Sequence, residues 1–301
     1  MPASGLFPAW FALSLACAAA CSKQSESAKP SAAGASAAAT AAPAALTQAT
    51  VPHATHEKPA CRVLVVSGVA TVDGTPLSTA ALLDGAHWVE LAAGASVALR
   101  HSATSREFKL IGPGHALPCR DGSEQILLAD GQLSTSANLG VRPGAEVLIA
   151  TPEGIVHYGD AALDLEFGAK GLRVRVKQGE AWVEPEERGQ PRFKNPVQNG
   201  TEARLPNTHP KPRSLVDACQ KSAETARESA ERVLRGQGAA GGDSLGARAA
   251  AHMRERSKAR TACAIAAVAA FSETNPADRQ SLSASVVHAD ELWQSVPRAG
   301  P

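Results

Sequence analysis

The sequence predicts a mainly β protein, a glycine-punctuated meander or sandwich, followed by a small α-helical hairpin or three-helix module. Three observations support this. Apolar and charged residues alternate with period two between residues 141 and 184, as in L-D-L-E-F at 163–167. Glycines separate the apolar runs at intervals typical of turns. From residue 213 the chain is rich in Ala, Glu and Arg, and its apolar residues recur every three or four positions.

Length and charge limit the classes of function. The 301 residues have room for one or two domains. The 30 Lys and Arg nearly balance the 29 Asp and Glu, so we expect no nucleic-acid partner. Aromatic residues make up only 4% of the chain, which argues against a large aromatic-lined cleft.

The N-terminus predicts export. Residues 6–20 form an uncharged apolar run of about fifteen residues, which fits a signal peptide better than a membrane span of ~20 residues. The run ends in A-A-A-C at 18–21, which resembles the lipobox of bacterial lipoproteins, whose cysteine is acylated. We therefore expect residues 1–21 to be a signal peptide and Cys21 to carry a lipid anchor. The alternatives are Cys17 as the acceptor, an uncleaved anchor, or an ordinary signal peptide.

Residues 22–60 predict a disordered tether. They are almost entirely Ala, Ser, Thr, Pro, Gln and Gly and show no apolar periodicity. A flexible chain of this length reaches on the order of 35 Å. His53 and His56 form an H-x-x-H here, which we interpret as solvated because a flexible pair lacks further metal ligands.

Residues 61–190 predict the β domain. Short β-branched runs recur about every ten residues between Gly-rich turns, which is typical of a sandwich or meander. Asp73-Gly74 is a hairpin turn signal. The expected strands include residues 62–66, 68–72, 88–91, 97–100, 108–110, 126–128, 147–149, 155–156, 163–167, 172–176 and 182–183. A weak echo between 85–97 and 144–156 also predicts a duplicated hairpin unit.

Five segments carry a resemblance to a known family: G-V-A-T-V-D-G-T-P-L (68–77), G-A-S-V-A-L (94–99), L-I-G-P-G (110–114), P-G-A-E-V-L-I-A-T-P-E-G-I-V (143–156) and V-R-V-K-Q-G-E-A-W-V (174–183). Together they resemble the FecR-type periplasmic domain over residues 62–184. The resemblance implies a non-enzymatic all-β module that senses or relays state in the bacterial envelope.

The last third of the chain predicts helices. Residues 191–212 read as a Pro-rich linker, and residues 213–296 as a helical module. The first helix ends before the Gly-rich stretch 236–242, and Asp243 or Ser244 caps the second. A third helix follows Asn275-Pro276.

Four cysteines lie beyond the leader, and an even number in an exported chain favours disulfides. Cys219 lies about 16 residues before the first helix ends, and Cys263 about 19 after the second begins. In an antiparallel hairpin these positions are level within ~5 Å, which predicts a disulfide. Buried free thiols or a zinc site are the alternatives. Nothing in the sequence fixes the approach of Cys61 to Cys119, so that bond stays open.

Catalytic signals are weak. Asp160, Asp164 and Glu166 cluster near His157, but in a strand they alternate outward, so we interpret them as a solvated sheet face. The sequence has no G-x-S-x-G, H-E-x-x-H or P-loop motif. Trp88, Trp182 and Trp293 are interpreted as core anchors, although an exposed pair would suit a glycan. We therefore expect no enzyme activity, cofactor or metal.

Together these features predict a lipid-anchored protein of the bacterial periplasm or cell surface. Its β domain would dock a protein partner or ligand and act in sensing, signal transduction or partner docking at the cell envelope. The alternative is a structural lipoprotein that binds cell-wall glycan.

Overall fold

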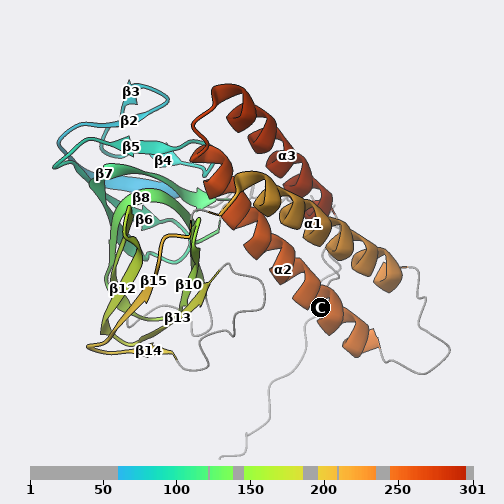
Figure 1. The fold of residues 1–301 in the computed structure, drawn as a ribbon. Coiled ribbons are helices and arrows are strands. Elements are labelled where there is room, and N and C mark those ends of the chain that lie inside the picture. The colour runs from blue at the N-terminus through green and yellow to red at the C-terminus, as the bar shows by residue number, and fades with distance from the viewer. Residues whose placement is uncertain are drawn as a thin grey trace, which may run out of the picture. The chain divides into compact units, whose positions relative to one another are not determined.

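The computed structural model describes residues 60–120, 123–137, 146–185, 196–208, 210–234 and 245–295, all within one compact unit. Fifteen strands are followed by three helices, which confirms the predicted fold class (Figure 1). The strands are β1 (Cys61–Ser67), β2 (Ala70–Val72), β3 (Thr75–Pro76), β4 (Leu82–Leu83), β5 (Val89–Leu91), β6 (Ser96–His101), β7 (Glu107–Arg120), β8 (Gln125–Thr135), β9 (Val147–Thr151), β10 (Gly154–Tyr158), β11 (Ala162–Gly168), β12 (Gly171–Gln178), β13 (Glu180–Pro185), β14 (Val197–Gln198) and β15 (Glu202–Leu205). The helices are α1 (Pro212–Leu234), α2 (Leu245–Phe271) and α3 (Pro276–Gln294).

Two layers of strands share the long β7–β8 hairpin. One, here called the helix-side layer, has the strand order β14-β13-β10-β9-β8-β7-β5-β2-β3. The other, here called the charged layer, has β4, β1 and β6 beside β7, and β11, β12 and β15 beside β8. Neighbouring strands are antiparallel except β8 and β9, which are parallel. The hairpin therefore belongs to both layers and holds them together.

Glycines allow this hairpin to pass from one layer to the other. The first half of β7 pairs with β6, and its second half pairs with β5. Where the second half begins, a Cβ on Gly114 would lie 2.5 Å from the carbonyl oxygen of Asp130 on β8. Gly131 on β8 has a φ of 102°, which L side chains rarely adopt. Only glycine fits where the two strands cross this closely.

The interior of the β body is filled from both layers. Alternate residues of each strand point inward, as the period-two pattern predicts. The charged layer contributes Leu99, Leu110, Leu165 and Val174 to this core, and the helix-side layer contributes Ile126, Ile149 and Val156.

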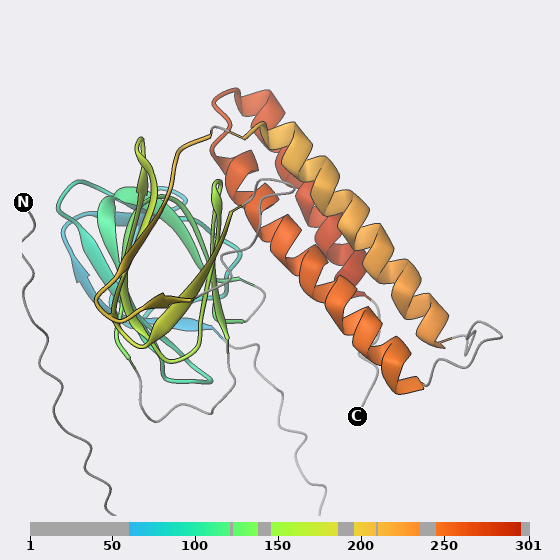
Figure 2. The same cartoon turned by 60° about the horizontal axis from the view of Figure 1, so that its bottom comes forward.

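The helices pack on the outer face of the helix-side layer (Figures 1 and 2). A second apolar cluster joins that face to all three helices, and its sheet residues are Leu117, Leu127, Ala129, Leu148, Ala150 and Ile155. They alternate with the inward residues of the same strands, so β8 and β9 are buried on both faces. The helices and the β body thus share a core.

Each part of the fold carries one disulfide. Cys219 on α1 pairs with Cys263 on α2 across a Cα–Cα distance of 4.5 Å. This is the pairing predicted from the positions of the two cysteines along an antiparallel helical hairpin. Cys61 on β1 pairs with Cys119 on β7 across 5.7 Å, which the sequence left open. Both bridges lie within one part, so the contact between the β body and the helices depends on packing and polar contacts.

Two predictions about organisation are wrong. The stretch 191–212, predicted as a linker, contains β14 and β15, and β15 pairs with β12 as part of the charged layer. The duplicated hairpin also fails, because β9 and β10 pair with each other whereas β5 and β6 lie in different layers. The repeated glycines mark turns in both places, but strand pairing is decided by the core.

Candidate binding cleft

The outer face of β10 and β13 forms one wall of a cleft. The register places His157 opposite Trp182 and Ile155 opposite Glu184, so all four side chains point outward on the same face. Their neighbours Val156 and Val183 point inward and are buried. The helices cover Ile155 fully, whereas Trp182 remains 39% exposed.

Helices α1 and α2 form the facing wall. Leu215, Ala218 and Ser222 follow one face of α1 at helical spacing. On α2 the lining residues are Ser257, Lys258, Thr261, Ala262 and Ile265. Glu146 and Pro185 complete the cleft, whose volume is about 810 Å³. A space of this size accommodates a small molecule or several side chains of a partner.

His157 lies between two carboxylates in this cleft. Its Nδ1 is 3.1 Å from Oε1 of Glu146, and its Nε2 is 3.9 Å from Oε2 of Glu184. The imidazole is mostly buried, and among the described residues neither ring nitrogen has a partner in hydrogen-bonding geometry. The ring therefore lies beside both carboxylates without a directed hydrogen bond to either. The strand wall combines an exposed indole with acidic oxygen atoms.

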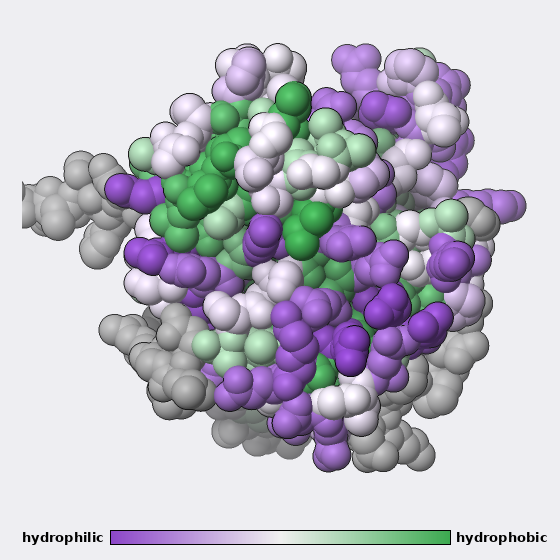
Figure 3. All heavy atoms as spheres, turned by 90° about the vertical axis from the view of Figure 1, so that its left-hand side faces the viewer, coloured by the Kyte–Doolittle hydropathy of each residue, from purple (hydrophilic) through white to green (hydrophobic). Residues whose placement is uncertain are grey.

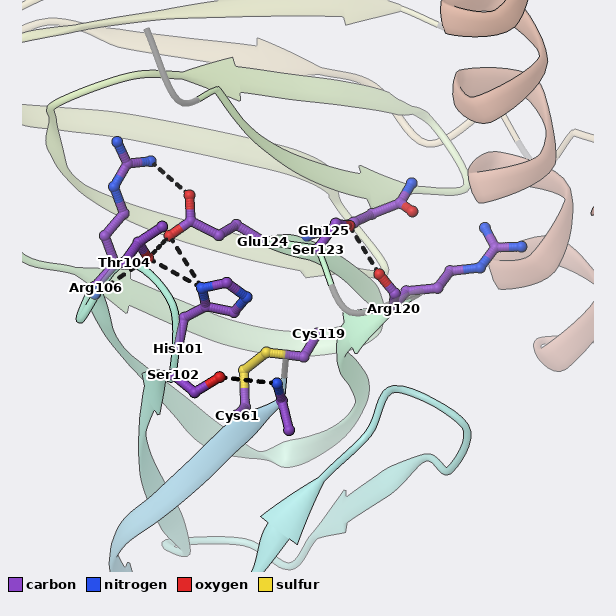
Figure 4. Close-up of a disulfide and its surroundings, with 11 residues drawn as sticks. Cys61, His101, Ser102, Thr104, Arg106, Cys119, Arg120, Ser123, Glu124 and Gln125 are labelled. Carbon is purple, nitrogen blue, oxygen red and sulfur yellow. Dashed lines mark hydrogen bonds and ion pairs between the residues drawn. A yellow bond between two sulfur atoms is a disulfide. The ribbon is translucent and has the colours of Figure 1, made fainter. Parts of the chain in front are cut away.

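A second polar cluster lies at the end of the β body near the Cys61–Cys119 disulfide (Figure 4). Arg106 Nη1 is 3.2 Å from Glu124 Oε2, and Glu124 also accepts a hydrogen bond from Thr104. His101 Nδ1 lies 3.0 Å from Thr104 Oγ1. Arg106, Glu124 and His101 are all buried, so this cluster fixes the end of the β body and is closed to ligands.

Burial also shifts the pKa of two further groups. Tyr158 faces the interior core, and desolvation raises the pKa of its phenol, against the opposing charge of Arg106. On α2, burial of His252, with a smaller contribution from the charge of Arg256, lowers the pKa of its imidazole. Neither group opens into the cleft, so both serve the fold.

Polar and aromatic contacts hold the helices on the β body. Arg120 of β7, which is buried, donates to the carboxylate of Asp290 on α3, which is partly buried. Arg260 Nη2 donates to Ser123 Oγ at 3.0 Å. Trp88 stacks on Phe271 at the end of α2, with ring centroids 3.9 Å apart. The helices are thus joined to the β body at several points.

The structure places the residues singled out in the sequence as follows. Asp164 and Glu166 lie exposed on β11, as predicted for a solvated face. Trp293 is buried as predicted, and Trp88 is half-buried, but the prediction of Trp182 as a core anchor is wrong because it occupies an outward position of β13. Cys21, His53 and His56 lie outside the described residues.

The sequence did not reveal the partners of His157. Asp160, Asp164 and Glu166 are near it in sequence, yet Glu146 and Glu184 contact it in the fold. The only sequence signal was the position of Trp182 and Glu184 on either side of the inward Val183.

In the described ranges, no group of three or more His, Cys, Asp or Glu is arranged to hold a metal ion. No described helix is both long and apolar enough to span a membrane.

Comparisons with known proteins give a distant likeness. No protein-family model matches the chain, and no curated protein matches it. Two crystal structures, each described as a "putative anti-sigma factor" from Parabacteroides distasonis, are similar in part. The first is 13% identical with a TM-score of 0.33, covering 40% of this chain and 55% of that one. The second is 9% identical with a TM-score of 0.26, covering 48% and 56%. The likeness thus spans about half of each neighbour's length.

Proposed function

We propose that the chain is a lipid-anchored protein of the bacterial envelope, located in the periplasm or at the cell surface. In this proposal it docks a protein partner and does not catalyse a reaction. The observation that carries the docking role is the cleft between β10–β13 and α1–α2, with Trp182 exposed on its wall. Exposed aromatic residues in concave surfaces are typical of protein-binding sites. A FecR-type module used in sensing or signalling is the finer form of this proposal.

Export and anchoring are part of the proposal. Two disulfides are typical of chains that leave the cytoplasm, and Cys21 follows a run of small residues after an apolar segment. In cells fed radioactive palmitate, the wild-type chain should be labelled and should fractionate with membranes. Cys21→Ser should lose the label, and Cys17→Ser should keep it. Label retained in Cys21→Ser would contradict the assignment of the anchor.

Docking through the cleft is tested by photo-crosslinking in intact cells. A benzophenone amino acid at Ser222, which lines the cleft, should give one discrete crosslinked protein after irradiation. The matched control carries the same amino acid at Glu166, exposed on the charged layer away from the helices. Trp182→Ala should remove the Ser222 product. Identical products at both positions, or no product at Ser222, would contradict docking at this cleft.

A second candidate is binding of cell-wall glycan. The exposed indole of Trp182 beside the carboxylate of Glu184 favours it, because sugar rings stack on indoles while their hydroxyl groups donate to carboxylates. Sedimentation with purified peptidoglycan tests this. A glycan-binding role requires the wild-type chain to sediment and Trp182→Ala to stay in the supernatant.

A further inference from the structure

The outward face of β1 and β4, on the charged layer, carries exposed aliphatic side chains. Val65 on β1 is 57% exposed, and Leu82 on β4 is 61% exposed. Val69, two residues after the end of β1, is 65% exposed. Single exposed aliphatic residues are common on protein surfaces, whereas several in one short stretch indicate a surface that another body covers.

A basic side chain lies in the same row of the sheet as Val65. The register places Val65 opposite Ala98 on β6, and Ala98 opposite Lys109 on β7. Neighbouring strands are about 4.8 Å apart, so the backbone of Lys109 lies roughly 10 Å from that of Val65, across the small side chain of Ala98. Lys109 is exposed, and within the described ranges it makes no ion pair.

The adjoining row repeats this arrangement. Leu82 pairs with Arg62 on β1, and Arg62 pairs with Arg100 on β6. Arg100 donates through its Nε to Glu107 Oε1 at 2.9 Å, so its charge is compensated. Arg62 is exposed and makes no ion pair with a described residue. We call the surface formed by Arg62, Val65, Leu82, Ala98, Arg100 and Lys109 the basic-aliphatic face.

The predicted tether joins the β body beside this face. β1 begins at Cys61, and the amide of Ala60 donates to Ser102 Oγ at 3.0 Å, which fixes the point of entry. Arg62 is the next residue along β1. A flexible chain of the length predicted between Cys21 and this point reaches on the order of 35 Å. With Cys21 acylated as proposed, the tether keeps the basic-aliphatic face close to the bilayer.

We propose that the basic-aliphatic face contacts the bilayer that holds the lipid anchor, at a surface rich in anionic phospholipid. Val65 and Leu82 enter the interfacial region, where burial of apolar surface is favourable. Arg62 and Lys109 lay their aliphatic stems beside them and place their charged ends at the phosphate groups. The inference rests on the proposed lipid anchor and adds the surface with which the β body meets the membrane.

This orientation leaves the candidate cleft accessible. The cleft lies on the helix-side layer, between β10–β13 and α1–α2, whereas the basic-aliphatic face is on the charged layer. The inward residues of both layers pack in one core, so the outward faces of the layers point away from each other. A docked partner and the bilayer therefore contact different sides of the β body.

Quenching of tryptophan fluorescence by brominated lipid tests the inference. The full chain, purified from bacterial membranes, is reconstituted into phosphatidylcholine vesicles with brominated acyl chains, with and without phosphatidylglycerol. The variants are Val65→Trp and Val287→Trp, and the emission of the added indole is obtained by subtracting that of the parent chain. Val287 is the matched control because it is also a valine, is also 57% exposed and lies on α3.

The added indole of Val65→Trp should lose most of its emission in vesicles that contain phosphatidylglycerol, whereas that of Val287→Trp should keep its emission. Adding Arg62→Gln and Lys109→Gln to Val65→Trp should restore most of the emission. Each Lys or Arg near an anionic surface strengthens the attraction about fivefold, so the loss of two weakens it substantially.

The matched charge control is Lys221→Gln/Arg227→Gln, which removes the same charge from exposed positions on α1 and should leave the quenching of Val65→Trp unchanged. Equal quenching in Val65→Trp and Val287→Trp, or none in Val65→Trp while the chain stays with the vesicles, would overturn the inference and leave the lipid anchor standing. A benzophenone at Val65 that crosslinks to a second copy or to another protein, without quenching, would assign the face to that protein instead. Release of the chain by an alkaline carbonate wash would contradict the anchor, and the inference with it.

Discussion

The two outer faces of the β body differ in what covers them. On the helix-side layer, the outward residues of β8 and β9 are apolar, namely Leu127, Ala129, Leu148 and Ala150, and they are buried under the helices. On the charged layer, the outward positions of β11, β12 and β15 hold ion pairs, such as Lys177 with Asp164 and Arg173 with Glu202. Figure 3 views the side away from the helices, where apolar side chains gather at the upper left and hydrophilic ones cover the lower centre and the upper right.

This difference shows that the helices are part of the same folding unit as the sheet. A strand that is apolar on both faces needs cover on both faces. The helices provide that cover, and their ends are fixed by Arg120–Asp290 and Trp88–Phe271. The part of the charged layer formed by β11, β12 and β15 needs no cover because its outward charged groups remain hydrated. The cleft lies at the edge of the surface that the helices cover on the helix-side layer. At this edge Ile155 is buried under the helices, whereas Trp182 is partly exposed.

Removing the helix disulfide should have the largest effect on this shared unit. The Cys219–Cys263 bridge closes a loop of 44 residues, and the chain-entropy account assigns such a loop about 4 kcal/mol of unfolding free energy. We expect Cys219→Ser/Cys263→Ser to lose about that amount in urea denaturation. Because the helices and the sheet share a core, helix circular dichroism and tryptophan fluorescence should report the same lowered midpoint.

The matched control is Cys61→Ser/Cys119→Ser, which opens a loop of 58 residues in the β body. It should cost a similar ~4 kcal/mol and shift both signals together. Separate transitions for the two signals in either variant would mean that the parts fold independently, contrary to the comparison of the two faces.

The next largest effect should come from a single side chain under the helices. Leu127 is fully buried between β8 and the helices, so Leu127→Ala should lower the unfolding free energy by about 2–5 kcal/mol. Glu166→Ala, on the outward face of the charged layer, should change it by at most about 0.5 kcal/mol. Urea denaturation of both variants gives the two values. Equal losses would contradict the distinction between a covered face and a hydrated one.

The sequence predicted the elements whose pattern is local. The hairpin of β11 and β12 followed from strict alternation around Gly168 and Gly171, and the helices followed from their periodicity and from Asn275, whose side chain accepts from the amide of Ala277. It missed β15, because Glu202–Leu205 is a short edge strand that buries little beyond Leu205.

The cleft was also beyond the reach of the sequence. It depends on the register of β10 against β13 and on the docking of α1 and α2, which are contacts between distant segments. The aromatic character of Trp182 favoured a core position, whereas its register, set by the inward Val183, places it outside. A pattern of residue types cannot distinguish these until the pairing of the strands is known.

The smallest effect should lie on the charged layer. Burial opposes ionisation of Asp164, but hydrogen bonds from Lys177 Nζ at 2.7 Å and from Ser134 outweigh it and lower the carboxyl pKa below 3.8. A lowered pKa in the folded state contributes stability above about pH 3.8, and this contribution is lost as the pH falls through the folded-state pKa.

Lys177→Ala should move the Asp164 pKa upward in a carboxyl NMR titration. Both side chains are about half exposed, so the unfolding free energy at pH 7 should fall by at most about 1 kcal/mol. A loss as large as that of Leu127→Ala would mean that this face is packed against something after all, and the contrast between the two layers would no longer hold.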